Sequence, residues 1–412
     1  MAPGEKQRLF LDYLNSAFRK KTSSGSGTAG ALADRRLVSI WTGGFPVGDE
    51  RVVLNWILTK SSDGRLIDIE VTSSELNDPE SKWKDAVQEF VTAVLKTALE
   101  EKREQFFRRI LFHYIGAQLD GEYRLPGFRF APAYPEDPEP SFFATERVVC
   151  IDLIVKAIDE NDASALAHEA ARRHAARLSL LLNVGLYVPD STRRWVIPQE
   201  AGQPPVTESR RYQLGFLHEG LGAQAMPPKG KVCKLGEYAG SLSARYREAG
   251  RLLSLPPESR KILRGMNAAP PQVAEAFDRG ARLYQVAAVV RMQFPSVAMA
   301  YRVAAVEAIS RAQNREFRDF VRQYVQPADD LEDLLDYLYG SVRSAHFHGG
   351  EFPLGEHAVI PVFDPFMDPE EAGRFELQGR CNDLIREAII RWMSEILPEV
   401  QQSARSDDTA PH

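Results

Sequence analysis

The sequence predicts an α+β N-terminal domain followed by an all-α helical bundle. In the N-terminal half, β-branched and aromatic residues alternate with polar ones in runs such as 51–60, 65–73 and 147–157, as they do in half-buried strands. After residue 236, apolar residues recur almost entirely at three- and four-residue spacing, which is typical of amphipathic helices. The alternating pattern of the N-terminal half and the helical spacing of the C-terminal half therefore indicate two domains of different fold class.

Composition narrows the kind of protein. At 412 residues the chain is long enough for two or three domains, and 44% hydrophobic with 26% charged residues is ordinary for a globular protein. The net charge of −6 argues against broad attraction to nucleic acid or anionic membranes, but it is compatible with a local basic groove. No run approaches the roughly 18 apolar residues of a membrane span. We therefore expect a cytoplasmic protein that binds no membrane.

The cysteines predict neither disulfides nor a metal site. Cys150, Cys233 and Cys381 lie far apart and form no CxxC or Cys/His pattern. We expect a reduced protein without metal or cofactor.

Residues 1–34 are expected to form a short N-terminal helix and a flexible Gly/Ser linker. Residues 1–20 carry apolar residues at helical spacing. Thr22–Gly30, TSSGSGTAG, contains a formal GxGxxG, but no strand is expected before it and its composition is typical of a linker. We therefore expect no nucleotide site there.

Residues 35–220 are expected to form the α+β domain, whose role the sequence does not disclose. Asp63-Gly64 between two apolar-rich runs predicts a hairpin, and Asp68 and Glu70 after it are expected on an exposed face. The remaining expected elements are a helix over 81–119, a strand over 147–157, a helix over 162–182 and short strands over 185–188, 194–197 and 212–218. In the helix expected over 162–182, His168 and His174 are six residues apart and lie on different sides, which argues against a shared metal. We expect both to be surface or capping residues.

Residues 221–268 are expected to be a connecting segment with helices, 269–400 the helical bundle and 401–412 a disordered tail. The helices expected after residue 236 span 237–253, 257–265, 271–293, 296–313, 315–324, 329–348 and 369–397.

The helix over 329–348 carries the residues with the most chemistry. Arg343, Ser344, His346 and His348 lie in its last turns, before the stop signal Gly349-Gly350. On an α-helix, a spacing of five separates two residues by about 140°, so Arg343 reaches His348 only through its long side chain.

An imidazole beside a guanidinium suits phosphodiester chemistry. The histidine can move a proton, and the arginine can hold a phosphate oxygen. The structural alternative is that Arg343 pairs with a carboxylate and that His346 and His348 cap the negative end of the helix.

The run LYGSVRSAHFHGG, residues 338–350, resembles the Arg-x4-6-His signature of HEPN domains, especially the Apea-like branch. The resemblance implies a helical bundle in which Arg343 and His348 are the signature pair and Ser344 is the polar residue after the arginine. His346 offers a second imidazole for the same role. Glu307, in the preceding helix, is similar to the acidic position of an Ala-x-Glu-Ala helix in these domains. The resemblance covers roughly residues 270–400.

Two alternatives concern the residues around this signature. Glu307 either orients the Arg343–His348 pair or lies at the surface beside Arg311 at i+4. Four arginines recur at spacings of four, three and four, and on one continuous helix they would form a basic stripe that either faces solvent or guides RNA. They are Arg311, Arg315, Arg318 and Arg322.

The function that the resemblance implies is that of a metal-independent endoribonuclease. The 2′-hydroxyl of RNA would attack the adjacent phosphate, with His348 as general base or acid and Arg343 stabilising the phosphoryl charge. Ser344 would supply a hydrogen bond and Glu307 would orient the pair. The resemblance also implies a homodimer through the helical domain, a regulatory partner such as an antitoxin, and a toxin or anti-phage setting. The alternative is a non-catalytic HEPN module that binds RNA or nucleotide, or dimerises, beside a sensing domain.

Overall fold

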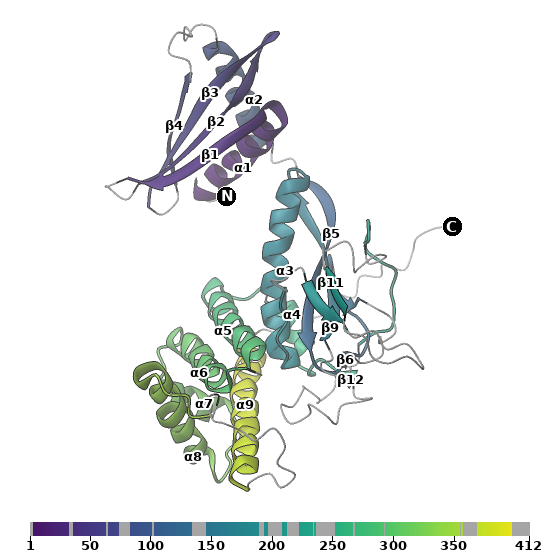
Figure 1. Cartoon of the computed structure of the whole chain (residues 1–412), viewed down its shortest axis with the longest axis vertical. Coiled ribbons are helices and arrows are strands. Elements are labelled where there is room, and N and C mark those ends of the chain that lie inside the picture. Colours follow the sequence, from purple (N-terminus) through teal and green to yellow (C-terminus); the bar gives the residue numbers. More distant parts are fainter. Residues whose placement is uncertain are drawn as a thin grey trace. The chain divides into compact units, whose positions relative to one another are not determined.

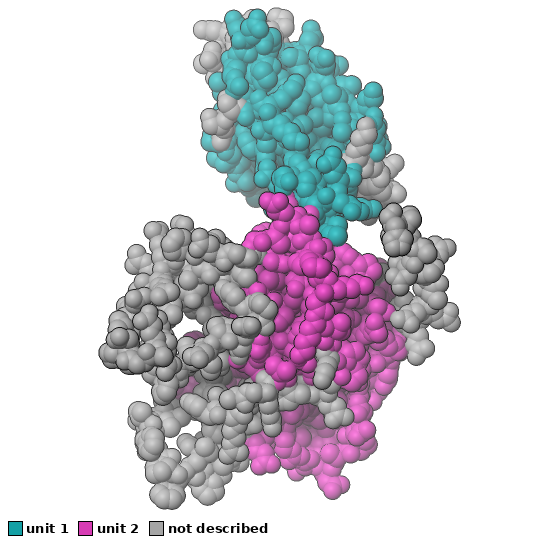
Figure 2. All heavy atoms as spheres, turned by 90° about the vertical axis from the view of Figure 1, so that its right-hand side faces the viewer, with its two compact units in different colours: residues 1–106, 154–167 teal, residues 107–153, 168–412 magenta. Residues whose placement is uncertain are grey.

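The computed structural model (Figure 1) describes residues 3–32, 36–62, 65–73, 83–100, 103–133, 146–188, 193–196, 208–211, 222–233, 235, 252–266, 268–291, 293–354, 356 and 369–397. The chain forms two compact units (Figure 2), residues 1–106 with 154–167 (unit 1) and residues 107–153 with 168–412 (unit 2). A sheet-rich N-terminal region is followed by a helical C-terminal region, as expected. The range 35–220, expected as one domain, is divided between the two units, and the expected tail 401–412 lies outside the described residues.

Unit 1 contains a four-stranded antiparallel sheet in the order β1-β2-β3-β4 and two helices that share its core (Figure 1). Its elements are α1 (Pro3–Lys21), β1 (Ser23–Ala31), β2 (Leu37–Val47), β3 (Glu50–Lys60), β4 (Leu66–Ser73) and α2 (Lys84–Leu99). Leu54 and Trp56 are buried on one face of β3, whereas Val53 is exposed on the other. Phe18 of α1 packs edge to face on Trp56, 5.1 Å between ring centroids. Asp68 and Glu70 are exposed on β4, as expected.

The expectation of a flexible linker at Thr22–Gly30 is wrong. Ser23–Ala31 is the edge strand β1 and pairs with β2 over the register Ser26↔Thr42 to Ala31↔Leu37. Strand pairing uses backbone N–H and C=O groups, so a neighbouring strand can recruit glycines and serines that have little β propensity of their own.

Unit 2 begins with a second four-stranded sheet, in the order β5-β9-β8-β7, followed by the long helix α3. These elements are β5 (Glu104–Ile115), β6 (Gln118–Leu119), β7 (Tyr123–Leu125), β8 (Phe128–Pro132), β9 (Glu146–Ala157) and α3 (Glu160–Leu182). Short pairs are formed by β10 (Arg193–Val196) with β11 (Glu208–Arg211), and by β12 (Leu252–Leu253) with β6. The unit ranges divide β5, β9 and α3.

The single helix expected over 81–119 is wrong in its second half, because the helix ends at Leu99 and residues 104–115 form β5. The strand expected over 147–157 and the helix expected over 162–182 are confirmed as β9 and α3. The strand expected over 212–218 lies outside the described residues, as does most of the helix expected over 237–253, of which the described residues 252–253 form β12 instead.

The helical part of unit 2 follows the expected segments closely. Its elements are α4 (Ser259–Gly265), α5 (Pro271–Val290), α6 (Pro295–Arg311), α7 (Phe317–Tyr324), α8 (Leu331–Asp336), the π-helix η3 (Tyr337–Gly349) and α9 (Pro369–Ile396). Proline opens both α5 and α6, where its missing N–H costs nothing. The axes of α5 and α6 approach closely because Gly280 leaves room for Ile309. Trp392 of α9 is fully buried beside Phe320.

Buried polar contacts join α3 to the helices within unit 2. Arg177 donates two hydrogen bonds to Asp278 of α5, at 2.7 and 2.9 Å. Tyr284 donates to Asn183 at 2.7 Å. His168 is exposed as expected, but His174 is not a simple surface residue, because its ring packs 4.4 Å from that of Phe128.

None of the three cysteines forms a disulfide, and all three are buried. In the part of the chain that the structure describes, no helix combines the length and the apolarity needed to cross a membrane.

Candidate functional site

The candidate site lies on η3, a helix wider than the α-helix expected there. It continues α8 without a break and ends at Gly349, and Gly350 adopts the left-handed conformation with φ 66°. The N–H of Gly350 donates to His346 O at 3.2 Å and that of Glu351 to Ala345 O at 3.1 Å, so carbonyls at the helix end are satisfied. The stop signal expected at Gly349-Gly350 is confirmed.

The π-helical conformation brings Arg343 and His348 together. A π-helix closes its hydrogen bonds between residues five apart, so side chains five apart lie on the same face rather than about 140° apart. Arg343 Nη1 donates to His348 Nε2 at 3.1 Å, and His348 is exposed at the helix end. A guanidinium has no acceptor, so Nε2 holds a lone pair in this contact. The neutral imidazole of His348 therefore carries its proton on Nδ1.

Glu307 of α6 holds the opposite edge of the Arg343 guanidinium. Its Oε1 lies 3.2 Å from Arg343 Nε in an ion pair without hydrogen-bond alignment, and its Oε2 accepts from Nη2 at 3.5 Å. Both side chains are mostly buried, 14% exposed for Glu307 and 20% for Arg343. Glu307 also lies 3.8 Å from Arg311, so both partners expected from the sequence are present, and Arg343 is the nearer.

Two aromatic rings confine Arg343 further. Its Cζ lies 5.4 Å from the ring centroid of Tyr339 and 6.0 Å from that of Phe347. A cation over aromatic faces is attracted by their quadrupoles. With Glu307 on one edge and His348 on another, the guanidinium has a defined orientation at the end of η3.

The structure separates the two candidate histidines. His346 Nδ1 lies 3.1 Å from the carbonyl oxygen of Glu351, which only accepts, so Nδ1 carries the proton. His346 therefore faces the following loop, and His348 is the histidine that meets Arg343. Ser344 is half-buried and forms no hydrogen bond through its hydroxyl within the described residues.

The four arginines expected as a basic stripe do not share one helix. Arg311 ends α6, Arg315 follows the turn, and only Arg318 and Arg322 belong to α7. The break lies at Asn314, whose φ is 54°. Arg318 pairs with Asp336 at 2.6 Å, Arg322 with Glu332 at 2.8 Å and Arg311 with Glu307. Of the four, only Arg315 lacks an ion-pair partner among the described residues.

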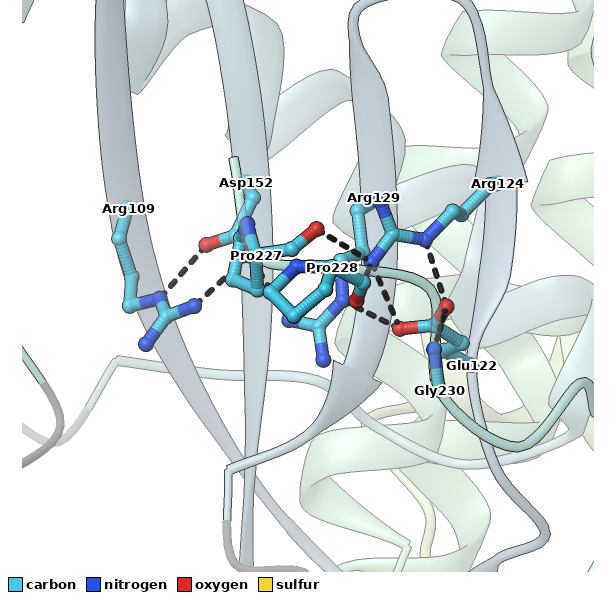
Figure 3. Close-up of polar contacts among 8 residues, drawn as sticks. All are labelled: Arg109, Glu122, Arg124, Arg129, Asp152, Pro227, Pro228 and Gly230. Carbon is cyan, nitrogen blue, oxygen red and sulfur yellow. Dashed lines mark hydrogen bonds and ion pairs between the residues drawn. The ribbon is translucent and has the colours of Figure 1, made fainter. Parts of the chain in front are cut away.

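A second cluster of charges, which the sequence analysis missed, lies on the sheet of unit 2 (Figure 3). Asp152 of β9 is fully buried and accepts from Arg109 at 2.7 and 2.9 Å and from Arg129 at 2.8 Å. Glu122 accepts from Arg129 at 2.5 Å and from Arg124 at 2.6 Å. Figure 3 shows the five side chains as a ladder of alternating sign, which we call the charge ladder.

The charge ladder fastens a distant segment of the chain. Arg124 Nη2 donates to the carbonyls of Pro227 and Pro228 at 2.9 and 2.6 Å, and Gly230 N donates to Glu122 Oε1 at 2.7 Å. Burial disfavours the ionised Glu122, but the hydrogen bonds from Arg124, Arg129 and Gly230 outweigh it and lower its pKa to about 2. Each of the five side chains has an oppositely charged partner, with three guanidiniums sharing two carboxylates, which is the behaviour of a structural network rather than of a reactive site.

A sequence signal for the charge ladder did exist. Asp152 is the only charge in the apolar run VVCIDLIV, and a carboxylate in a buried strand needs partners. The arginine directly across the sheet is Arg129, because β8 and β9 pair in the register Arg129↔Asp152. That register could not be read from the sequence.

No group of three or more His, Cys, Asp or Glu side chains in the described ranges is arranged to hold a metal ion. Comparison of the chain with protein-family models, with curated proteins and with solved structures gives no match.

Proposed function

We propose that this protein is a metal-independent endoribonuclease of HEPN type. The observation that carries the proposal is the contact of 3.1 Å between Arg343 and His348, at an exposed helix end, with Glu307 behind the arginine. These are the residues that the resemblance assigns to the signature pair and to the acidic position. Their convergence supports a shared role on one phosphate.

The reaction needs one base, one acid and one stabiliser of phosphoryl charge. His348 takes the proton from the ribose 2′-hydroxyl through Nε2 as the 2′-oxygen bonds to the adjacent phosphorus. The bond from phosphorus to the 5′-oxygen then breaks, and that oxygen takes its proton from the imidazolium of His348 formed in the first step, which returns the histidine to its starting state. The products are a 2′,3′-cyclic phosphate and a free 5′-hydroxyl. The nucleophile belongs to the substrate.

In this scheme, Arg343 Nη1 donates to one hydrogen-bond acceptor before RNA binds and to another after RNA binds. Without RNA its Nη1 occupies the lone pair of His348 Nε2. A phosphate oxygen is a stronger, charged acceptor, so it draws Nη1 away and leaves Nε2 available as a base. Glu307 keeps the Nε–Nη2 edge in place during this exchange and is therefore a positioning residue.

The proposed setting also follows from the resemblance. It includes a homodimer through the helical part, a toxin or anti-phage role, and a regulatory partner such as an antitoxin. In a dimer related by two-fold symmetry, two η3 helices would contribute to one composite site.

One observation favours a second candidate, a non-catalytic HEPN module that binds RNA or nucleotide, or dimerises. Both reactive groups are already engaged, since Arg343 is held by Glu307 and two rings and His348 Nε2 accepts a hydrogen bond. A pair locked in this way would bind a phosphate without cleaving it.

The test is cleavage of mixed single-stranded RNA by the purified full chain in EDTA, with analysis of the product ends. Wild-type protein is expected to leave 2′,3′-cyclic phosphates. His348→Ala should slow cleavage by about 10²–10⁴-fold, the usual contribution of a general base. His346→Ala should lower the cleavage rate far less than His348→Ala does. His168→Ala is the control for removing an exposed imidazole elsewhere in the chain.

Two outcomes would overturn the proposal. If the wild type cleaves only when a divalent metal is added, the mechanism is wrong. If folded wild-type protein cleaves no RNA but binds it, and Arg343→Ala weakens that binding, the binding module is the better assignment.

A further inference from the structure

An aromatic surface flanks Arg343 on η3. Phe347 is 47% exposed, and its ring lies 5.4 Å from that of His346 and 6.3 Å from that of Tyr301. The ring of His346 lies 5.3 Å from that of Phe352, which is 36% exposed. We call Tyr301, His346, Phe347 and Phe352 the aromatic surface.

The ring of Phe347 has neighbours that restrict its orientation. Its ring is bordered by Tyr301, by the edge of His346 and by the guanidinium of Arg343, 6.0 Å from the centroid. His346 is itself fixed by the carbonyl of Glu351. A rigid, exposed aromatic ring offers contact area at little cost in side-chain entropy.

The charges around η3 make recognition of a long phosphate backbone weak. Arg318 and Arg322 are balanced by the carboxylates of Asp336 and Glu332. With a net charge of −6 the chain has no excess of cations to draw RNA in. Arg343 is paired with Glu307, but it is the cation that lies beside both His348 and Phe347. Of Arg311, Arg315, Arg318 and Arg322, only Arg315 lacks an ion-pair partner among the described residues. Few cations are thus left for phosphate, and further affinity has to come from uncharged contacts.

We propose that Phe347 stacks on the nucleobase next to the phosphate that Arg343 holds. The proposal rests on the proposed function of the Arg343–His348 site and adds its specificity element. The distance of 6.0 Å between guanidinium and ring lets one nucleotide contact both, since its base and phosphate are joined through one sugar. Aromatic side chains stack on bases only when these are unpaired and splayed from the helix. The ligand is thus a locally unstacked nucleotide of any base.

The experiment measures binding without cleavage. A fluorescent 2′-O-methyl RNA strand lacks the attacking hydroxyl, so the full-length wild-type protein can be titrated against it by anisotropy. Phe347→Ala is expected to weaken binding by about 5- to 150-fold, the effect of losing one base stack. Phe347→Trp should retain the affinity. Phe347→Leu, which keeps an apolar side chain without a π-face, should behave like the alanine variant.

Two further measurements distinguish base stacking from binding through phosphate contacts alone. The same strand annealed to its complement should bind more weakly than the single strand, because its bases are already stacked. The logarithm of the binding constant should fall with the logarithm of salt concentration with a slope of about −0.7, corresponding to one phosphate contact on a single strand. A slope of about −3 or steeper would show a cationic track and would overturn the proposal.

Failure of this inference differs from failure of the proposed function. If wild type cleaves RNA and Phe347→Ala binds as tightly as wild type, the stacking assignment is wrong and the nuclease stands. If no RNA is cleaved but binding depends on Phe347 as described, the stacking assignment stands and the nuclease is wrong. If Phe347→Ala instead lowers the mass of the RNA-free protein by sedimentation, with unchanged RNA affinity, the stacking assignment is also wrong and Phe347 belongs to an interface between two copies of the chain.

Discussion

Replacing Glu122 by glutamine should weaken the charge ladder in a pH-dependent way. The folded pKa of Glu122 is about 2 against an ordinary 4.5, and one pH unit corresponds to about 1.4 kcal/mol. The ionised carboxylate, whose side chain is 5% exposed, thus contributes at most about 3 kcal/mol. Because its folded pKa lies below the unfolded one, this contribution is present above about pH 4.5 and is lost as the pH falls toward 2.

The difference is measurable between pH 5 and pH 3. Between pH 5 and pH 3, Glu122 takes up a proton in the opened state but stays ionised in the folded state. The stabilisation that Glu122 contributes to the folded state therefore falls by about 2 kcal/mol. The Glu122→Gln variant lacks this pH-dependent stabilisation, although the amide oxygen of the glutamine can still accept a hydrogen bond from Gly230 N. The gap in opening free energy between wild type and variant should therefore be about 2 kcal/mol larger at pH 5 than at pH 3.

Hydrogen exchange of the fastened segment is the assay. Gly230 N donates to the Glu122 side chain and Cys233 N to its carbonyl. The slowest amides of peptides covering 227–233, which exchange only when Glu122 is also released from Arg124 and Arg129, report the opening free energy. Glu169→Gln is the control, because Glu169 forms an exposed ion pair with Arg173 and its loss should change protection by less than about 0.5 kcal/mol. A gap between wild type and Glu122→Gln that is the same at both pH values would refute the reasoning.

Two predictions concern packing in unit 2. Burial, with the nearby Arg177 and Arg173, lowers the pKa of His174 to about 4, so folding excludes its proton and the unit should lose up to about 3 kcal/mol as the pH falls from about 6.5 to 4. In urea unfolding at pH 7 and pH 4, the His174→Leu variant should therefore lose less stability on acidification than the wild type does. An equal loss in wild type and variant would contradict the assignment of this acid sensitivity to His174. Gly280→Ala places a methyl 2.6 Å from Ile309 Cδ1 and should cost about 1–3 kcal/mol in thermal unfolding. The methyl group of Gly379→Ala meets nothing within 4 Å, so this substitution should raise the free energy of unfolding by about 0.5–1 kcal/mol. Equal stabilisation by Gly280→Ala and Gly379→Ala would show that helix propensity, rather than the contact with Ile309, determines the effect.

The helices of the C-terminal part could be predicted because their signals are local. Proline at the first turn and apolar residues at helical spacing place α5, α6 and α9 to within a few residues. The two errors in the N-terminal half have a common cause. Strand β1 and the strand over 104–115 are defined by their neighbours, and a short apolar run such as RRILFHYI fits a buried strand as well as a helix.

The site was predictable in its residues but not in its geometry. Arg343, His348 and Glu307 could be proposed from their types and from the resemblance, and the structure brings them together. Their convergence depends on the width of η3, which is set by the size of the backbone hydrogen-bond ring and leaves no mark in the apolar pattern. The ion pairs that divide the expected arginine stripe likewise depend on the break at Asn314.

Under the proposed function, the width of η3 affects stability and activity in opposite ways. π-Helices are rare and mostly occur as single-turn bulges, whereas η3 runs for 13 residues, so a deletion between Arg343 and His348 would favour local return to the commoner α-helical hydrogen bonding. The shortened helix would then place the two side chains four apart, with a different approach of imidazole to guanidinium and a rotated Phe347. Thermal stability alone would favour such a deletion, whereas the proposed function, which needs the present placement of Arg343 and His348, would select against it. The length of this helix is therefore a property on which the two pressures act in opposite directions.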